Sequence, residues 1–223
     1  MSDASSADLQ SVEIEYVEGG RRLFVFFGGL AAGVSIPPFE FYRAAQIVNE
    51  HRIFIRDFAQ VWYHCGLPGV SSDIPSTVSW LQRQIEALQP TEVVFVGNSM
   101  GGYAAMLFGA LAGGVRTIAF SPQSFISPWR RCLAGDRRWP RQVRKTCRAS
   151  LLRYRAWDLK PILSHRPVQI DLFAPQGHRL DRYHAERLGD IPGITLHLLP
   201  CDTHGLVRLL KEQGRLPALL AGS

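Results

Sequence analysis

The chain has 223 residues, a length that fits one α/β domain with a sizeable core or two small domains. With 46% hydrophobic and 20% charged residues it has the composition of an ordinary globular protein, and nothing in it suggests a coiled coil or a solenoid. No apolar run reaches the length of a membrane span, and the four cysteines are too widely spaced for a zinc site or a disulfide framework. We therefore expect a cytoplasmic protein that needs no metal and no cofactor.

The first residues, 1–10, are rich in serine, alanine and aspartate. They lack the positive-then-apolar pattern of a signal peptide, so we expect a mobile tail. The remaining residues, 11–223, are expected to form a single domain.

Two strands and a glycine-rich loop are predicted at the start of this domain. Val12–Val17 alternates apolar and acidic residues, which is typical of a half-exposed edge strand. Arg21–Phe27 is continuously apolar after its arginines, which indicates a strand buried on both faces. Gly28-Gly29-Leu30 follows directly and is either an oxyanion-binding loop or a tight turn, because glycines let backbone N–H groups approach a ligand closely. We take the N–H of Gly29 or Leu30 as a candidate oxyanion donor.

The next elements alternate between helix and strand. Pro37-Pro38 predicts the start of a helix over Phe39–Asn49, and Arg52–Asp57 predicts a short strand. Residues 58–75 form a long loop, a length that is common in functional or mobile segments. A helix capped by Ser76 or Thr77 is predicted to run to Leu88.

The stretch Val93–Met106 carries the strongest functional signal. It is an apolar run of strand length, then Gly97-Asn98-Ser99-Met100-Gly101, then small and apolar residues at helical spacing. This pattern predicts a strand, a sharp turn at Ser99 and a helix, with glycines where the turn crowds backbone against backbone. Such a turn holds the Ser99 hydroxyl at the end of a sheet and places the N–H of Met100 for an oxyanion. The simpler interpretation is a glycine-rich turn with an ordinary serine.

Residues 125–164 interrupt the alternation after a strand predicted at Val115–Phe120. The segment 129–155 holds ten arginines and lysines against the single acid Asp136, so its net charge is +9 while that of the whole chain is +6. Tryptophans and a tyrosine are interleaved with these charges. About forty residues are marginal for an independent core, so we interpret 125–164 as a helical insertion within the domain.

The alternation then resumes. Val168–Phe173 and Ile194–Pro200 are predicted strands, and helices are predicted to begin at Asp181 and Leu206. Strands that alternate with helices predict an α/β fold with a mostly parallel sheet flanked by helices on both faces. Ligand sites in such sheets lie at the carboxyl ends of the strands. The groups that fall there are Gly28-Gly29-Leu30, Ser99, Asp181 and His204.

The order Ser, Asp, His along the chain is that of the α/β-hydrolases. The sequence resembles this superfamily from about Val12 to Leu210: Gly97 to Gly101 match the nucleophile elbow, Gly28-Gly29-Leu30 resembles the oxyanion loop, and Thr203-His204-Gly205 resembles the histidine loop. The resemblance implies a Ser-His-Asp hydrolase or acyltransferase that acts on an ester or thioester through an acyl-serine. It implies Ser99 as nucleophile, His204 as base, Asp181 as acid, and Met100 with Gly29 or Leu30 as the oxyanion hole.

The histidine and the acid are separate assignments. His204 is favoured because, of the seven histidines, it alone follows the last predicted strand in the expected order; a surface or capping histidine is the simpler alternative. Asp181 is favoured as the acid, although the loop 174–180 before it is longer than usual and Asp181 also suits a helix N-cap. The other acids considered are Asp171 within its strand, Asp202 two residues before His204, and the more distant Glu186.

The basic insertion lies where this superfamily commonly carries its lid. We assign substrate-binding roles to Tyr103, Trp129, Arg130 and Arg131. The positive charge suggests an anionic substrate or partner: a phosphopantetheine or coenzyme A thioester, an acyl carrier or other acidic protein, or an anionic glycan. No nucleic-acid motif is present. The alternatives are a solvated helical face, and a protein that keeps the fold without activity and docks an acidic partner through the insertion.

Overall fold

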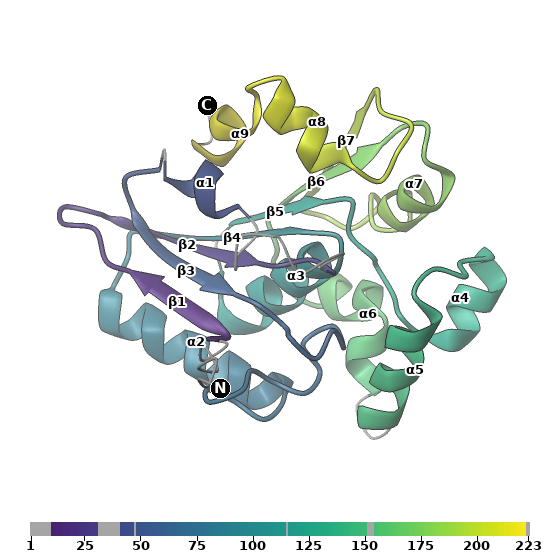
Figure 1. Cartoon of the computed structure of the whole chain (residues 1–223), viewed down its shortest axis with the longest axis horizontal. Helices are drawn as coiled ribbons and strands as arrows, with labels where there is room; N and C mark the ends of the chain where they lie inside the picture. Colours follow the sequence, from purple (N-terminus) through teal and green to yellow (C-terminus); the bar gives the residue numbers. More distant parts are fainter. Residues whose placement is uncertain (1–9, 31–40, 47, 115, 151–153, 222–223) are drawn as a thin grey trace, which may run out of the picture.

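The computed structural model describes residues 10–30, 41–46, 48–114, 116–150 and 154–221, and a seven-stranded sheet crosses it in the order β1-β3-β2-β4-β5-β6-β7 (Figure 1). The β1 strand pairs antiparallel with β3, and the other neighbours are parallel. The predicted α/β fold with a mostly parallel sheet is therefore confirmed. The strands are β1 (Val12–Glu15), β2 (Arg22–Phe27), β3 (His51–Ile55), β4 (Glu92–Asn98), β5 (Arg116–Phe120), β6 (Ile170–Pro175) and β7 (Ile194–Leu199).

Helices cover both faces of the sheet. One face packs against α1, α8 and α9, and the other packs against α2, α3 and α6, as Figure 1 shows. The helices are α1 (Tyr42–Ala45), α2 (Ile74–Leu88), α3 (Met100–Ala112), α4 (Pro128–Ala134), α5 (Pro140–Ala149), α6 (Leu159–Ser164), α7 (Arg179–Glu186), α8 (Leu206–Glu212) and α9 (Leu216–Ala221), with a 3₁₀ turn at Tyr154–Trp157.

The β2 strand is apolar from Leu23 to Phe27 because both of its faces are buried there. Phe24 and Phe26 face the α1, α8 and α9 side, while Phe27 faces the α3 side and stacks between Phe95 and Phe108. Successive side chains of a strand point to opposite faces, so a strand with helices on both sides needs apolar residues at every position. The burial of β2 and β4 holds the carboxyl ends of these strands in place, and the candidate site lies at those ends.

Two helix predictions differ from the structure. The helix predicted over Phe39–Asn49 is described only from Phe41 onward and spans just Tyr42–Ala45, because Phe41 has a left-handed backbone (φ 69°). At its other end, the Ala45 carbonyl accepts hydrogen bonds from the Arg52 guanidinium (2.9 Å) and from the Val48 N–H (3.0 Å), which ends the helix in a turn.

The cap of α2 is the second difference. Asp73, not Ser76 or Thr77, is the N-cap, and its carboxylate accepts the N–H of Ser76 (2.8 Å) while the Ser76 hydroxyl accepts the N–H of Asp73 (3.1 Å). This reciprocal pair is a capping box with a serine in the third helical position. Most of the predicted tail, residues 1–9, lies outside the described residues.

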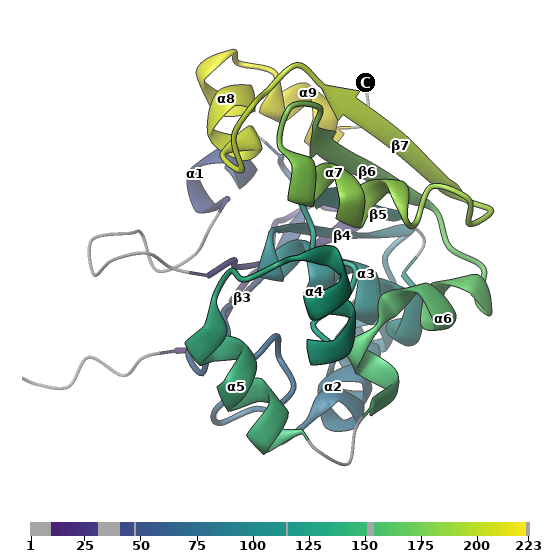
Figure 2. The same ribbon diagram turned by 90° about the vertical axis from the view of Figure 1, so that its right-hand side faces the viewer.

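The segment predicted as an insertion, residues 125–164, leaves the body after Ser124 and returns at Trp157 and Leu159, whereas its last helix, α6, packs against α3 of the body. The N–H of Ile126 donates to the Trp157 carbonyl (2.9 Å), and the N–H of Leu159 donates to the Ser124 carbonyl (2.9 Å). Between these bonds the chain forms α4, α5 and the 3₁₀ turn. Figure 2 shows α4 and α5 on the same side of the molecule as α7, the helix that follows β6.

Candidate active site

The turn between β4 and α3 has the geometry of a strained elbow. Ser99 adopts φ 56° and ψ −117°, a region that L residues rarely occupy. A Cβ on Gly97 would overlap the Gly101 carbonyl, and a Cβ on Gly101 would overlap the Phe27 carbonyl. Glycine is therefore required at both positions, because the backbone at Gly97 lies against that at Gly101, and the backbone at Gly101 lies against the end of β2.

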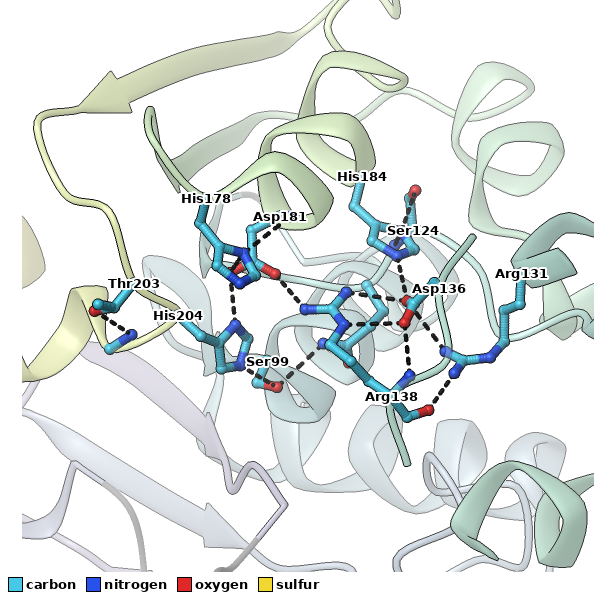
Figure 3. Close-up of polar contacts among 12 residues, drawn as sticks. Ser99, Ser124, Arg131, Asp136, Arg138, His178, Asp181, His184, Thr203 and His204 are labelled. Atoms are coloured by element: carbon cyan, nitrogen blue, oxygen red, sulfur yellow. Dashed lines mark hydrogen bonds and ion pairs between the residues drawn. The ribbon is translucent and has the colours of Figure 1, made fainter. Parts of the chain in front are cut away.

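Ser99, His204 and Asp181 are joined by hydrogen bonds in series (Figure 3). His204 Nε2 lies 2.9 Å from Ser99 Oγ, and His204 Nδ1 lies 2.6 Å from Asp181 Oδ2. Ser99 follows β4, Asp181 lies in the first turn of α7 after β6, and His204 follows β7; these three strands end at one edge of the sheet. His204 is the most exposed of the three residues: its side chain is 33% exposed, whereas Asp181 is fully buried and Ser99 is 5% exposed.

The surroundings of Asp181 keep its carboxylate charged. Burial raises the pKa of Asp181, but hydrogen bonds from His204 and Arg138 and the charge of Arg138 outweigh burial, so the pKa lies below its ordinary value. His178, the N-cap of α7, places Nδ1 2.9 Å from Asp181 Oδ2. Because the carboxylate is an acceptor only, it favours the tautomer of His204 that carries its proton on Nδ1. Nε2 is then free to accept the Ser99 hydroxyl proton.

The acids considered as alternatives lie elsewhere. Asp171 pairs with Arg116 (2.9 Å) and lies 3.2 Å from His197, and the exposed Glu186 pairs with Arg182. Asp202 packs against Gly177, where a Cβ would overlap its carboxylate oxygen. The N-cap alternative for Asp181 also differs from the structure, since α7 begins at Arg179 and Asp181 is its third residue.

The loop after β2 lies directly against the elbow. A Cβ on Gly101 would come within 3.0 Å of the Gly28 backbone carbon, and the Gly28 carbonyl accepts the Tyr63 hydroxyl (2.8 Å). The Gly28 N–H itself is used by the Ile55 carbonyl (2.9 Å). Gly29 and Leu30 follow Gly28 in the chain, and Met100 is the first residue of α3, so its N–H has no acceptor four residues earlier in that helix.

Gln123 contacts Ser99 and was not identified from the sequence. Its Nε2 donates to Ser99 Oγ (3.1 Å), and its Oε1 accepts the Trp62 indole N–H (3.2 Å), which fixes the orientation of the amide. Gln123 and Trp62 are both fully buried. Nothing in the spacing of Gln123 marks it, since its role depends on the strand β5 ending beside β4.

The carboxylate of Asp57 helps to hold the loop that carries Trp62. Asp57 Oδ2 accepts the N–H groups of Val61 (2.7 Å) and Tyr63 (2.9 Å), and both Trp62 and Tyr63 have left-handed backbones. Burial raises the pKa of Asp57 despite these hydrogen bonds. The long loop predicted over 58–75 thus contributes a buried tryptophan to the surroundings of Ser99.

A buried charge network lies behind Asp181 (Figure 3). Arg138 Nη1 donates to Asp181 Oδ1 (2.6 Å), and the same guanidinium binds both oxygens of Asp136 (3.0 Å each). Asp136 also contacts Arg131 and His184, each at 3.2 Å. Asp136 is the lone acid of the basic segment, and this was the available signal that a buried ion pair lies there.

The four residues predicted to bind substrate have side-chain contacts with groups other than Ser99 in the described part of the chain, and their proposed role stays a prediction. The Tyr103 ring is fully buried with its hydroxyl 3.3 Å from His64 Nε2, and burial raises its pKa well above the ordinary value. Arg131 is buried against Asp136, Arg130 pairs with Asp158, and Trp129 is 71% exposed on α4. The tryptophan that approaches the site is Trp139, whose ring centroid lies 5.8 Å from that of His204.

Neither a metal-binding cluster nor a membrane-spanning helix is found among the described residues. Between residues 10 and 221, leaving out the undescribed positions, no group of three or more His, Cys, Asp or Glu side chains is placed to hold a metal ion. Among the helices of that same part of the chain, none combines the length and the apolar character that crossing a bilayer requires.

Comparisons with solved structures show the same fold. The chain is similar to the capsule O-acetyltransferase of Neisseria meningitidis serogroup A (TM-score 0.66, 13% identity, 92% of this chain and 90% of that one). It is also similar to the carboxylesterase CesB of Bacillus subtilis (TM-score 0.57, 16% identity, 98% and 90%). The Gap123 glycosylation-associated complex of Streptococcus agalactiae gives a TM-score of 0.67 at 14% identity, with 93% of this chain but 43% of that one covered.

A comparison with curated protein sequences found no match. A family model, described as the alpha/beta hydrolase family, matches residues 27–219. This range includes the elbow, the insertion and the loops that carry Asp181 and His204. The chain therefore belongs to the alpha/beta hydrolase family.

Proposed function

We propose that the protein is a serine hydrolase or acyltransferase that cleaves an ester or thioester through an acyl-Ser99 intermediate. The observation that carries the proposal is the hydrogen-bonded series from Ser99 Oγ through His204 to Asp181, at 2.9 and 2.6 Å. Membership of the alpha/beta hydrolase family, and the fold shared with an esterase and an O-acetyltransferase, support activity of this broad class.

In the proposed reaction each proton transfer has a named donor and acceptor. His204 Nε2 takes the Ser99 proton as Oγ bonds to the acyl carbon, and Asp181 stabilises the imidazolium that forms. The N–H groups of Met100 and of Gly29 or Leu30 are the proposed donors to the oxyanion, and losing one such donor costs about 3 kcal/mol in similar enzymes. His204 then protonates the leaving group, and water or another acceptor releases the acyl group by the reverse sequence.

The surface of the insertion favours an anionic substrate or carrier. Apart from the buried Asp136, residues 129–155 hold no acid, and the exposed side chains there include Arg137, Arg141, Arg144 and Arg148. Trp129 and Leu133, one helical turn apart on α4, are 71% and 68% exposed. A phosphopantetheine or coenzyme A thioester, or an acidic carrier protein, has the complementary charge. A lid function of the insertion and a cytoplasmic location are part of this proposal.

Labelling with a fluorophosphonate probe tests the nucleophile. Wild type and the Ser124→Ala variant are expected to be labelled, and Ser99→Ala is expected to be spared. Ser124 is a matched control because it also contacts a histidine but is fully buried. Equal labelling of Ser99→Ala and wild type would discard the proposal and leave the alternative, a non-catalytic protein that docks an acidic partner.

The substrate charge is tested with a pair of acetyl thioesters. Acetyl-coenzyme A carries phosphates, whereas acetyl-N-acetylcysteamine is neutral. If the insertion binds the phosphates, Arg141→Glu combined with Arg144→Glu lowers kcat/KM for the coenzyme A thioester at least tenfold and leaves the neutral thioester within about twofold. Parallel losses on both substrates would contradict this part of the proposal.

A further inference from the structure

Arg138 is the one residue of the insertion that is hydrogen-bonded to the proposed catalytic acid in the described part of the chain. Its Nη1 donates to Asp181 Oδ1 (2.6 Å), while the other oxygen, Oδ2, takes the hydrogen bond of His204 (2.6 Å). The two carboxylate oxygens therefore have separate partners. With both occupied, the carboxylate plane cannot rotate without breaking a charge-assisted hydrogen bond.

The guanidinium of Arg138 is itself held from several sides. Its Nε and Nη2 bind the two oxygens of Asp136, each at 3.0 Å, and its backbone N–H donates to the same carboxylate (3.0 Å). The guanidinium also lies over the Trp139 ring, 4.7 Å from the centroid. An arginine fork can bind two carboxylates at once in a fixed geometry, which a lysine ammonium cannot do.

Asp136 is fixed in turn by the body of the protein. His184 of α7 accepts the Ser124 backbone N–H at Nδ1 (3.1 Å), so its proton resides on Nε2 and is donated to Asp136 (3.2 Å). Burial raises the pKa of Asp136, but the hydrogen bonds from His184 and Arg138 hold it well below the ordinary value. The chain of contacts thus begins and ends on α7, with Arg138 between Asp136 and Asp181.

We propose that Arg138 is a positioning residue for the reaction of Ser99: it fixes the Asp181 carboxylate toward His204 and couples the docking of the insertion to the catalytic site. This inference rests on the proposed function. Arg138 does not touch Ser99 in the described contacts, and it acts through Asp181.

The charge of Arg138 lies beside the Asp181–His204 pair and contributes to the lowered pKa of Asp181, so its removal is expected to change the pH dependence of the reaction. The charged and titratable groups around the pair are Arg138, His178, and, behind Arg138, Asp136 with its partners Arg131 and His184. Removing the positive charge of Arg138 favours the protonated, neutral form of the pair over the anionic one. The working, unprotonated form is then reached only at higher pH.

The test compares Arg138→Met, Arg138→Lys and a control, Arg83→Met, which removes an exposed arginine of α2 outside the network. The rate of fluorophosphonate labelling is measured from pH 5 to 9, and kcat and KM are measured for a neutral ester. Arg138→Met is expected to lower the rate at pH 7 roughly 10- to 100-fold. The acidic limb of the pH–rate profile of Arg138→Met is expected to move up by about one pH unit, while the profile of Arg83→Met is expected to match that of wild type.

Arg138→Lys separates charge from geometry and remains informative if Arg138→Met does not fold. It is expected to leave the acidic limb in place and to lower kcat about tenfold at unchanged KM, because an ammonium cannot serve both carboxylates. Wild-type kcat in Arg138→Lys, or an unmoved acidic limb in folded Arg138→Met, would overturn the inference.

A readout without substrate separates this inference from the proposed function. The pH titration of the His204 ring nitrogens is followed by NMR with ¹⁵N-histidine, assigned with His204→Gln. The midpoint is expected to move upward in Arg138→Met and to stay in Arg83→Met. If Ser99→Ala is labelled like wild type, the proposed function fails, whereas an unmoved midpoint in Arg138→Met rejects the role of Arg138 alone.

Discussion

The described part of the chain holds two hydrogen-bonded groups made of one serine, one histidine and one aspartate, and they are arranged in opposite ways. In the first, His204 turns Nε2 toward Ser99 and Nδ1 toward Asp181. In the second, His184 turns Nδ1 toward Ser124 and Nε2 toward Asp136. Figure 3 shows both groups side by side, linked through Arg138.

The two groups differ in the solvent exposure of the histidine and in whether one of its ring nitrogens has a lone pair left to accept the serine proton. His184 and Ser124 are fully buried, and the Nδ1 lone pair of His184 is already used by the Ser124 backbone N–H. The His204 side chain is 33% exposed, and Ser99 sits on a strained turn at the end of β4. Under the proposed function, a serine, a histidine and an aspartate in contact are not sufficient for nucleophilic catalysis. We propose that the free lone pair, the access and the elbow determine which group reacts.

Replacing each histidine by glutamine gives the largest expected contrast between the two groups. His204→Gln removes the base and is expected to lower kcat/KM about 10⁴-fold or more. His184→Gln removes a buried hydrogen-bonding group and is expected to lower the stability by about 1–3 kcal/mol, with at most about a tenfold loss of activity. Ester turnover and urea unfolding measure the two effects. Similar kinetic losses in both variants would contradict the distinction.

The aspartates are expected to divide in the same way. Asp181→Asn should lower kcat roughly 10³- to 10⁴-fold, because it favours the wrong tautomer of His204. Asp136→Asn leaves Arg131 buried without its anion and leaves Arg138 with Asp181 alone, so we expect a loss of about 3–5 kcal/mol in the free energy of unfolding. Its kinetic loss should be near tenfold, through Arg138. A stable Asp136→Asn protein would show that the network does little to hold the insertion.

The second group also makes stability depend on pH. The pKa of Asp136 is lowered in the folded state, so its contribution is present above about pH 3.9 and is lost as the pH falls through the folded value. Burial lowers the pKa of His184, so the unfolded chain takes up a proton first and stability falls as the pH drops below about 6.5.

Urea unfolding between pH 8 and 2 checks both signs. His184→Gln is expected to flatten the curve from about pH 6.5 to 5, and Asp136→Asn is expected to make it less steep below about pH 4. Curves that run parallel to wild type in both variants would show that these groups are not the source of the pH dependence.

The smallest expected effect concerns the amide that contacts Ser99. Gln123→Leu removes the donor to Ser99 Oγ and is expected to lower the labelling rate about tenfold, the equivalent of one hydrogen bond. Trp62→Phe frees the amide oxygen of Gln123 and should lower the rate less. If Gln123→Leu is labelled at the wild-type rate, Gln123 does not contribute to the reactivity of the Ser99 hydroxyl, and His204 is the contacting side chain that does.

The sheet and the edge that carries the site could be predicted because their signals are local. An apolar strand followed by Gly97 to Gly101 predicts the elbow, and the order of Ser99, Asp181 and His204 follows the order of the strand ends. The predicted residues are brought together at that edge, which a parallel sheet requires of residues that follow its strands.

Arg138, Asp136, His184 and Gln123 could not be placed because each has a partner that is distant in sequence, as Asp181 is for Arg138 and His184 is for Asp136. The basic segment was interpreted as a solvated or anion-binding face, whereas Arg131 and Arg138 turn inward to share the one acid available. The early end of α1 depends on Arg52, which binds the Ala45 and Val48 carbonyls. Such pairings are determined by tertiary packing, which composition and periodicity do not report.

The most direct test of the central claim is the mass of the protein after brief incubation with acyl esters and thioesters, followed by peptide mapping. The account predicts one acyl adduct, on the peptide that carries Ser99, absent from Ser99→Ala and from His204→Gln and present in Ser124→Ala. An adduct that persists in Ser99→Ala, or that maps to a peptide without Ser99, would contradict it.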